Sequence, residues 1–210
     1  MSMTDVKNRI ILDLCGGTGG WSRPYREAGY DVRIIDPQVW LPNNSGTGDV
    51  RLFEKLNRIK EPVYGVLSAP PCTEFAVSGA QWWEGKGEEP LLEGLSVVDA
   101  CIRISIMHKP KFWALENPVG RLRRYLGDPT LIFQPCDYGD DYNKKTLLWG
   151  EFNDELEKNP VKPDLVDLPN GRGKMSRNYL ESWSKPPAER ARLRSETPPG
   201  FAQAFFNANQ

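Results

Sequence analysis

Arg-Ile-Ile-Leu-Asp-Leu-Cys-Gly-Gly-Thr-Gly-Gly-Trp, residues 9–21, joins a short apolar run to a glycine-rich loop. The apolar part, residues 9–14, is typical of a buried strand. The four glycines of residues 16–20 allow a sharp turn, and they let a ligand approach the amides that open the next helix, expected at residues 21–28. A strand, a glycine turn and a helix in this order predict the first unit of an α/β fold with a ligand-binding edge.

The segments on either side of this unit continue the alternation of strands and helices. Further strands are expected at residues 31–36, 63–68, 112–116, 131–134 and 146–149, and further helices at residues 92–107, 119–126 and 202–209. We therefore expect an α/β fold with a Rossmann-like, doubly wound sheet whose strands are mostly parallel.

Composition divides the chain into three parts. Residues 1–150 hold the alternating elements and form the expected catalytic and cofactor-binding core. Residues 151–194 are rich in Pro, Asn, Asp and Lys and show little periodicity, so we expect a short recognition or wrapping segment. Residues 195–210 form a C-terminal segment that returns to the core.

Composition also excludes several classes of protein. The 27 Lys and Arg residues nearly balance the 28 Asp and Glu residues, so the chain is no uniformly basic nucleic-acid coat, although a local basic face stays open. Its four cysteines form no Cys-x-x-Cys pair and it has one histidine, His108, so we expect no metal site. No apolar run approaches the ~18 residues of a membrane span, and the first residues lack a signal peptide's apolar region. We expect a soluble, cytoplasmic protein, with its oligomeric state open.

Polar side chains follow several expected strands at the point where each strand ends. They are Asp13, Asp36, Cys72, Glu116 and Asn117. Because the carboxyl ends of parallel strands meet at one edge of a sheet, we expect these side chains to surround a single site. Such an edge favours an enzyme or a cofactor-binding protein.

The glycine loop and Asp36 together indicate a nucleoside site. A carboxylate at the end of the second strand is suited to accept hydrogen bonds from ribose hydroxyls. The loop departs from the dinucleotide pattern G-x-G-x-x-G, so a nucleoside without a pyrophosphate, such as S-adenosylmethionine, fits better than NAD. The alternative is a structural turn with a capping aspartate.

Cys72 follows two prolines that stiffen the chain, so its sulfur is expected at the edge of the site. A thiolate there can attack an electron-poor carbon. A lone cysteine is otherwise a small buried hydrophobic residue, and this is our interpretation of Cys15, Cys101 and Cys136.

Glu116 closes an apolar strand. Partial desolvation should raise its pKa, as a proton donor requires. The alternative is a carboxylate that caps the helix expected at residues 119–126.

These motifs, in this order, resemble the DNA cytosine-5 methyltransferase family. The matching residues are Asp-Leu-x-x-Gly-x-Gly-Gly at 13–20, Pro-Pro-Cys at 70–72 and Glu-Asn at 116–117. The chain is more specifically similar to short, phage-type members that lack a full target-recognition domain, through Glu-Asn-Pro-Val-Gly-Arg-Leu at 116–122 and Lys-Lys-Thr-Leu-Leu-Trp at 144–149. The resemblance implies a fold of the S-adenosylmethionine-dependent methyltransferase type.

The resemblance also implies an activity, which is methyl transfer to C5 of cytosine in DNA with the target base flipped out. Cys72 would be the nucleophile that adds to C6, Glu116 would hold and protonate N3, and Asn117 would support the loop. Lys144 stands where the family has the first arginine of a Gln-x-Arg-x-Arg segment and would lie near the base.

The implied cofactor is S-adenosyl-L-methionine. The residues implied to surround it are Asp13, Gly17, Gly19, Gly20, Asp36, Asp49, Pro70 and Thr197. Asp13 and the glycine turn would hold the methionine end, while Asp36 would bind the ribose and Asp49 would face the adenine. Thr197 stands roughly where the family has a cofactor-contacting Asn.

The chain departs from the family in several places. Cys15-Gly16 stand where the family has Phe-Ser, Thr73 stands where it has Gln or a similar residue, and the last motif is abbreviated. Two other functions stay open: the same chemistry on RNA or a free cytosine nucleotide, and an inactive cofactor-binding module that interacts with nucleic acid. The presence of Cys72, Glu116 and Asp36 together argues against inactivity.

Residues 151–194 carry side chains suited to DNA contacts, namely Arg172, Lys174, Arg177, Arg190, Tyr179 and Trp183. This mixture suits phosphate contacts and a wedge into a base stack, so we expect a short or relaxed target sequence. The alternative is a scaffold that wraps the sheet edge.

Two further groups have open interpretations. Trp82 and Trp83 are a lid or stacking platform, or they pack a loop. Arg121, Arg123 and Arg124 contact phosphates, or they form a solvated helix face.

Overall fold

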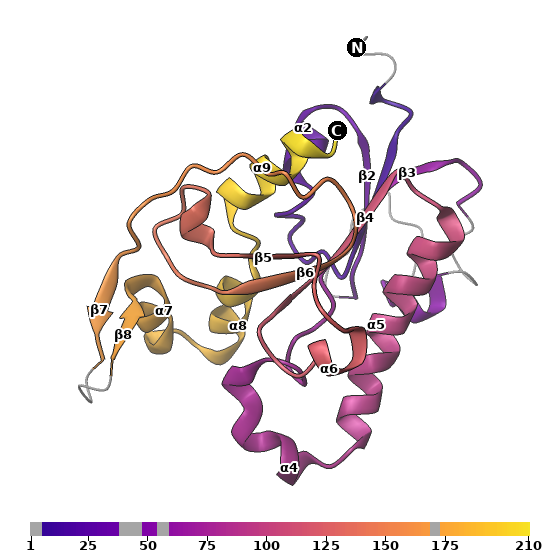
Figure 1. Cartoon of the computed structure of the whole chain (residues 1–210). Coiled ribbons are helices and arrows are strands. Elements are labelled where there is room, and N and C mark those ends of the chain that lie inside the picture. The colour runs from indigo at the N-terminus through magenta and orange to yellow at the C-terminus, as the bar shows by residue number, and fades with distance from the viewer. Residues whose placement is uncertain (1–5, 38–47, 54–58, 169–172) are drawn as a thin grey trace.

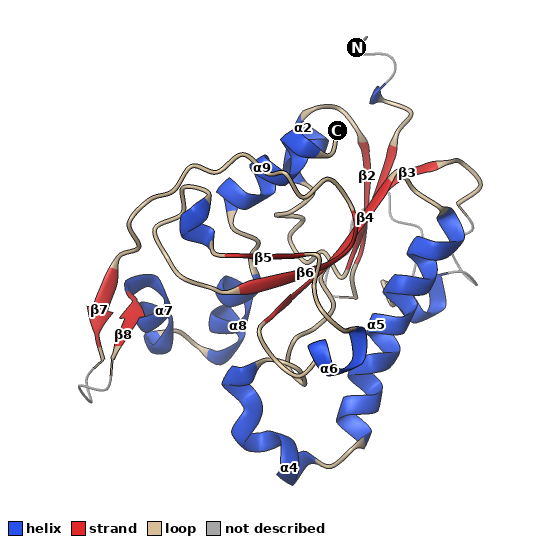
Figure 2. Ribbon diagram, viewed as in Figure 1, coloured by secondary structure: helices blue, strands red, loops and turns tan. Residues whose placement is uncertain are grey.

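The computed structural model describes residues 6–37, 48–53, 59–168 and 173–210. Within these residues, the strands form a six-stranded sheet and a separate two-stranded sheet (Figure 1, Figure 2). The strands of the large sheet are β1 (Ile10–Leu14), β2 (Asp31–Ile35), β3 (Val63–Ser68), β4 (Phe112–Pro118), β5 (Leu131–Phe133) and β6 (Thr146–Glu151).

The large sheet has the strand order β2-β1-β3-β4-β6-β5. Strands β1 to β4 are mutually parallel, whereas β6 runs antiparallel to both of its neighbours, β4 and β5. All five residues of β1 are buried, as expected of a central parallel strand that is covered on both faces.

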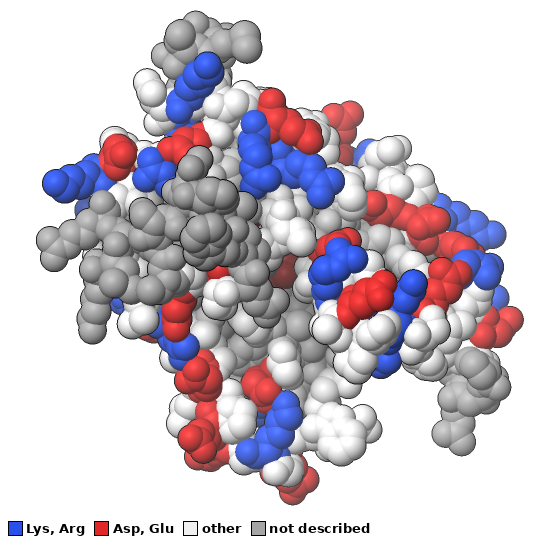
Figure 3. Space-filling view, turned by 180° about the vertical axis from the view of Figure 1, so that it is seen from behind, with Lys and Arg blue, Asp and Glu red and all other residues white. Residues whose placement is uncertain are grey.

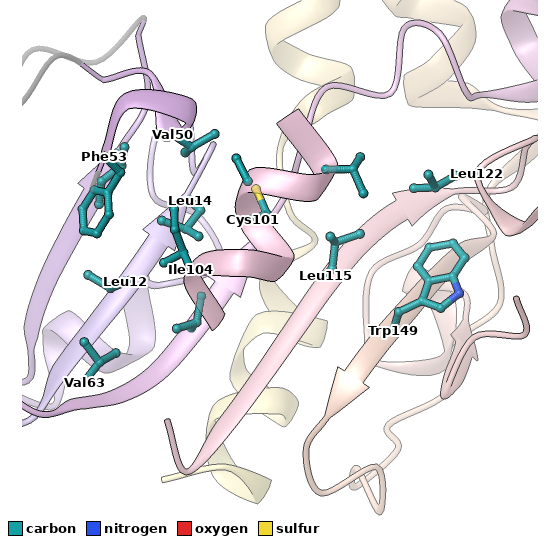
Figure 4. Packing of buried hydrophobic residues seen from close by; sticks show 14 of the residues in the cluster. Leu12, Leu14, Val50, Phe53, Val63, Cys101, Ile104, Leu115, Leu122 and Trp149 are labelled. Carbon is teal, nitrogen blue, oxygen red and sulfur yellow. The ribbon is translucent and has the colours of Figure 1, made fainter. Parts of the chain in front are cut away.

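One face of the sheet is covered by α5 (Glu89–His108). Leu12 and Leu14 of β1 and Leu115 of β4 lie in the same buried cluster as Cys101 and Ile104 of this helix (Figure 4). The helix ends at His108, and the following residue, Lys109, adopts the left-handed conformation.

The opposite face is covered by α2 (Arg23–Glu27) and α9 (Pro199–Ala208). Ile11, which alternates with Leu12 along β1, packs on this side with Tyr25, Phe201 and Phe205. Helices on both faces of a mainly parallel sheet confirm the predicted doubly wound α/β fold. The predicted closing helix is also confirmed.

The remaining elements are short. They are η1 (Val50–Leu52), η2 (Val77–Trp82), α4 (Trp83–Lys86), α6 (Arg123–Leu126), η3 (Pro135–Asp137), β7 (Leu165–Asp167), β8 (Lys174–Ser176), α7 (Arg177–Glu181), η4 (Ser182–Ser184) and α8 (Pro187–Ser195).

Two expectations need correction. The helix expected at 119–126 is reduced to α6, because Gly120 pairs with Ala76 in an antiparallel bridge and keeps the preceding chain extended. Residues 151–194, in which no element was expected, hold the β7–β8 hairpin and three short helical elements, α7, η4 and α8. These elements are too short and too polar to give a periodic apolar signal.

Positive and negative side chains are interspersed over the face shown in Figure 3, in keeping with a net charge of −1. None of the helices among the described residues combines the length and the apolar character that crossing a membrane requires.

Candidate active site

The ends of β3 and β4 bring the predicted nucleophile and the predicted acid to the same edge. Ser68, the last residue of β3, pairs with Leu115 of β4. Cys72 follows β3 by four residues and Glu116 follows Leu115 directly. The buried Asn117 side chain then donates a hydrogen bond from Nδ2 to the carbonyl oxygen of Pro70, at 3.0 Å, so the two loops are tied together.

Cys72 is exposed, and its thiol has a charged environment. The surrounding protein desolvates the thiol and raises its pKa, and the negative charge of Glu116 raises it further. The positive charges of Lys144 and Arg194 act in the opposite direction. A ligand can therefore reach a thiol whose ionisation depends on two nearby cations.

Glu116 is half-buried within β4. Burial raises the pKa of its carboxyl group, as expected from the sequence, and the charge of Lys144 lowers it. Helix α6 begins seven residues later, at Arg123, so the alternative of a helix cap is wrong. In this environment the Glu116 carboxyl group keeps its proton to a higher pH than an ordinary glutamic acid does, as a proton donor requires.

The positive charge of Lys144 acts on both groups and lowers the pKa of Cys72 and of Glu116. Lys144 precedes β6, whose residue Leu148 pairs with Glu116 of β4. The antiparallel course of β6 thus brings a cation from late in the chain to the edge formed by the parallel strands.

Two residues near this cluster were not found from the sequence. Arg194, at the end of α8, contributes its charge at Cys72, and its guanidinium lies 3.7 Å from the centre of the Tyr179 ring. The second residue is Tyr142. Burial raises the pKa of its hydroxyl group, and the charges of nearby carboxylates, Glu116 among them, raise it further. Both are tertiary neighbours of the site, and no local pattern marks them.

Asp13 lies beneath the glycine loop. Its side chain is fully buried and accepts a hydrogen bond from Ser22 Oγ, and burial raises its pKa to about 6. A Cβ at position 16 would lie 2.3 Å from Asp13 Cγ, so only glycine fits over the carboxylate. Asp13 Oδ1 is buried and, among the described residues, has no hydrogen-bond partner.

Asp36 lies at the end of β2 and faces the same loop. Its carboxylate accepts a 2.9 Å hydrogen bond from the amide of Gly17, whose φ of 52° is in the left-handed region. Gly19 also has a positive φ, 73°. The loop therefore bends around the carboxylate that was predicted to bind a ribose.

Asp49 follows Gly48, whose backbone lies against that of Asp36. A Cβ on Gly48 would lie 2.4 Å from the carbonyl oxygen of Asp36, so the two segments are in close contact. The Asp49 carboxylate caps η1 and forms an ion pair with Arg51 at 2.7 Å, which lowers its pKa. In this structure Asp49 therefore has a protein partner of its own.

The C-terminal segment also reaches the glycine loop. A Cβ on Gly20 would lie 3.7 Å from the backbone nitrogen of Thr197, which is ordinary van der Waals contact. Thr197 follows α8 and precedes α9, and α9 packs against Trp21 through Phe201 and Phe205. The structure thus places Thr197 beside the glycine loop that is expected to hold the cofactor.

The structure gives different surroundings to the two tryptophans, and to Arg121 and Arg123. Trp82 is 61% exposed, whereas Trp83 packs on the guanidinium of Arg121 at 4.5 Å. Arg121 is no solvated residue, because its side chain is 10% exposed and faces Glu74. Arg123 pairs with Asp128 on the surface.

A cavity of about 330 Å³ lies between the segment 151–194 and Asn143. Its lining residues are Asn143, Leu165, Lys174, Met175, Ser176 and Tyr179. Asn143 is adjacent to Lys144 in the chain, and Tyr179 carries Arg194 on its ring. Arg172, expected among the DNA-contacting residues, lies outside the described residues.

No cluster of three or more metal-ligating side chains occurs in the described part of the chain. Cys15 also lies at the edge of the sheet, with a φ of 56°, but it is half-buried. A hydrogen bond with the Cys101 thiol and burial raise the pKa of Cys15. Cys72 therefore has the more accessible thiol at this edge.

Comparison with known proteins finds a relative among the methyltransferases. The chain is 28% identical over 170 residues to the type II methyltransferase M.DdeI of Desulfomicrobium norvegicum, a match that covers 66% of this chain. This chain spans 39% of the length of that relative. No family model matches the chain. The match supports the methyltransferase resemblance that the motifs indicate.

Two solved structures are similar at a lower level. One is described as a DNA modification methyltransferase encoded within a prophage of E. coli, with a TM-score of 0.45, 21% identity, and coverage of 76% of this chain and 56% of that one. The other is the Entamoeba histolytica methyltransferase EhMeth, with a TM-score of 0.43, 15% identity, and coverage of 75% and 58%.

Proposed function

We propose that this chain, which is 28% identical over 170 residues to a type II methyltransferase, methylates C5 of cytosine in DNA through a covalent adduct on Cys72. The observation that carries the proposal is the meeting of Cys72, Glu116 and Lys144 at the ends of β3, β4 and the lead into β6. A nucleophile, an acid and a cation within reach of one another match the needs of addition to a pyrimidine ring.

The residues around the glycine loop fit S-adenosyl-L-methionine. Asp36 lies at the loop, where its carboxylate accepts a hydrogen bond from Gly17 and would accept others from ribose hydroxyls. The buried Asp13 Oδ1 has no hydrogen-bond partner among the described residues, and Thr197 borders Gly20 on the other side. When bound there, the cofactor supplies an electrophilic methyl group.

The chain's own residues would carry the remaining chemistry. The Cys72 thiolate forms a bond to C6 of cytosine while Glu116 donates a proton to N3, so electron density moves to C5. C5 then takes the methyl group and loses its proton to solvent. The bond between sulfur and C6 would break as the C5–C6 double bond re-forms, N3 would return its proton to Glu116, and Cys72 would be released. The donor, having lost its methyl group, would leave as S-adenosylhomocysteine.

DNA requires that the target base leave the helix. Flipping costs a few kcal/mol, which contacts made by the protein must offset. Trp82 is exposed on the segment that follows Cys72 and would contact the base stack. Lys174 and Arg177, which pair with Asp167 and Asp164 on the surface, would exchange these partners for phosphates. Affinity dominated by phosphates should fall steeply with added salt.

Residues 151–194 would supply what sequence recognition the chain has. The cavity between β7, β8 and α7 combines an aromatic ring, amide and hydroxyl groups and Lys174 beside the catalytic edge. One such cavity offers few base-edge contacts, so a short or relaxed target is expected. Bisulfite sequencing of methylated plasmid tests this: a strict site of six or more base pairs would contradict it.

Transfer of a tritiated methyl group from the labelled cofactor tests the activity itself. Duplex DNA, RNA and dCMP are supplied separately, with a Cys72→Ala variant as the control. The proposal expects label in DNA cytosine C5 from the wild-type protein only. Label confined to RNA or dCMP would move the substrate to that class, and no label in any of the three would contradict methyl transfer to cytosine.

A further inference from the structure

The turn after Cys72 is held against the residues that follow β4, and we call this set of contacts the clasp. We propose that Arg121 is a positioning residue that holds the Cys72 turn against the end of β4, which carries Glu116. The inference rests on the proposed function for its catalytic meaning, but the contacts that carry it are independent of that function.

The clasp begins with backbone pairing between residues 74–77 and 119–121. The amide of Arg121 donates to the carbonyl of Phe75 at 2.8 Å, and the amide of Val77 donates to the carbonyl of Val119 at 3.0 Å. Gly120 is needed for this approach, because a Cβ there would lie 1.8 Å from the oxygen of Phe75. Residues that follow Glu116 are thereby paired with residues that follow Cys72.

The Arg121 side chain reinforces the same pairing. Its Nε donates to the carbonyl oxygen of Glu74 at 2.5 Å, and its guanidinium lies 3.9 Å from Glu74 Oε2. The other carboxylate oxygen of Glu74 pairs with Lys86 at 2.7 Å, and Trp83 covers the guanidinium. The Arg121 and Glu74 side chains are only 10% and 15% exposed, so solvent screens this pair weakly.

These contacts lead directly to Cys72. The carbonyl oxygen of Cys72 accepts hydrogen bonds from the amides of Phe75, at 2.9 Å, and Ala76, at 2.8 Å. Arg121 holds the carbonyls of Glu74 and Phe75 in that same turn. On the other side of Cys72, Asn117 holds the carbonyl of Pro70. Asn117 of β4 and Arg121, which follows β4, therefore hold the chain before and after Cys72.

These contacts fix the thiol relative to Glu116 and Lys144. A misplacement of about 1 Å in a reacting group can cost on the order of 10²-fold in rate, so the loss of the contacts on one side should slow addition to the base. The planar guanidinium suits the task, because it donates from Nε to a carbonyl while its charge faces Glu74. A lysine keeps the charge but not this geometry.

The test measures how fast and how completely the protein forms an adduct with DNA that contains 5-fluorocytosine. The variants are Arg121→Ala and Arg121→Lys, and the matched control is Arg33→Ala, which removes an arginine that is also held by carboxylates but lies on β2. We expect about a 10- to 100-fold slower rate for Arg121→Ala and an intermediate rate for Arg121→Lys, each with the full final amplitude per folded protein.

Several results would overturn the inference. A wild-type rate in Arg121→Ala, or in Arg121→Lys, would show that the side-chain hydrogen bond does not position Cys72. A reduced amplitude at an unchanged rate would show that Arg121 serves folding alone. If Arg121→Ala does not fold, Arg121→Lys decides between these results.

A second measurement keeps this inference separate from the proposed function. Hydrogen exchange of residues 74–77 should become faster in both Arg121 variants, while exchange in β3 and in Arg33→Ala stays unchanged. Unchanged exchange at 74–77 would overturn the clasp. The absence of any adduct in the wild-type protein would instead contradict the proposed function and leave the exchange result to decide the role of Arg121.

Discussion

The side-chain amide of Asn117 donates a 3.0 Å hydrogen bond to the carbonyl oxygen of Pro70, although the two residues are 47 positions apart in the chain. Asn117 is fully buried. The bond connects the end of β4, which carries Glu116, to the turn after β3, which carries Cys72.

Loss of this bond should cost both stability and turnover. In Asn117→Ala the Pro70 carbonyl has no partner, which should lower the free energy of unfolding by about 1–3 kcal/mol. Urea unfolding measures the change, with Asn207→Ala, an exposed asparagine on α9, as the control within about 0.5 kcal/mol of wild type. Equal stability of the two variants would contradict a structural role for the bond.

Glu116→Gln should retain the fold and the cofactor but lose the proton donated to N3. A positioned acid is worth ~10²–10⁴ in rate, so kcat should fall by that order. The measurement is single-turnover methylation at saturating S-adenosylmethionine, alongside calorimetry of S-adenosylhomocysteine binding. Near-normal turnover would show that Glu116 is not the acid.

Lys144→Met should move the ionisation of Cys72 to higher pH. Burial and the charge of Glu116 raise the pKa of this thiol, and the charge of Lys144 lowers it. Because a nearby cation favours the thiolate, removing Lys144 should raise the pKa further. The pH dependence of Cys72 alkylation, followed by peptide mass spectrometry, measures the shift. Lys145→Met, a change of the exposed neighbour, should leave the alkylation profile in place, and a profile unaffected by Lys144→Met would remove this cation from the site.

Asp36→Ala should weaken binding of S-adenosylhomocysteine by on the order of 1–3 kcal/mol, the worth of a hydrogen bond to a charged group. The same change frees the Gly17 amide, which Asp36 now holds. Asp31→Ala, at the other end of β2, is the control, because its carboxylate pairs with Arg33. Unchanged affinity in calorimetry would exclude Asp36 from the cofactor site.

The sequence predicted the elements that are specified by local apolar pattern. Strand β3 lies at the expected residues 63–68, and β1 begins one residue after the expected start. Helix α5, expected at 92–107, extends to Glu89–His108 because Pro90 fits its first turn and Lys109 takes the left-handed conformation after its end. In each case the burial pattern is contained within the segment itself.

The rest depends on contacts between distant parts of the chain. The antiparallel direction of β6 depends on the path of the chain after β5, which no local pattern encodes. The helix expected from 119 is lost because Gly120 and Arg121 pair with the Cys72 turn instead. Arg194 reaches the site from α8, in a segment whose elements carry no periodic apolar signal.

The covalent step is the central claim, and 5-fluorocytosine DNA tests it most directly. Because the fluorine at C5 cannot leave as a proton does, Cys72 should stay bonded to C6 once the methyl group has been transferred. Incubation with S-adenosylmethionine and DNA in which every cytosine is 5-fluorocytosine should give a protein–DNA adduct whose digest locates the bond at Cys72. Cys15→Ala and Cys136→Ala should form the adduct and Cys72→Ala should not, whereas an adduct in Cys72→Ala, or none in the wild-type protein, would contradict the account.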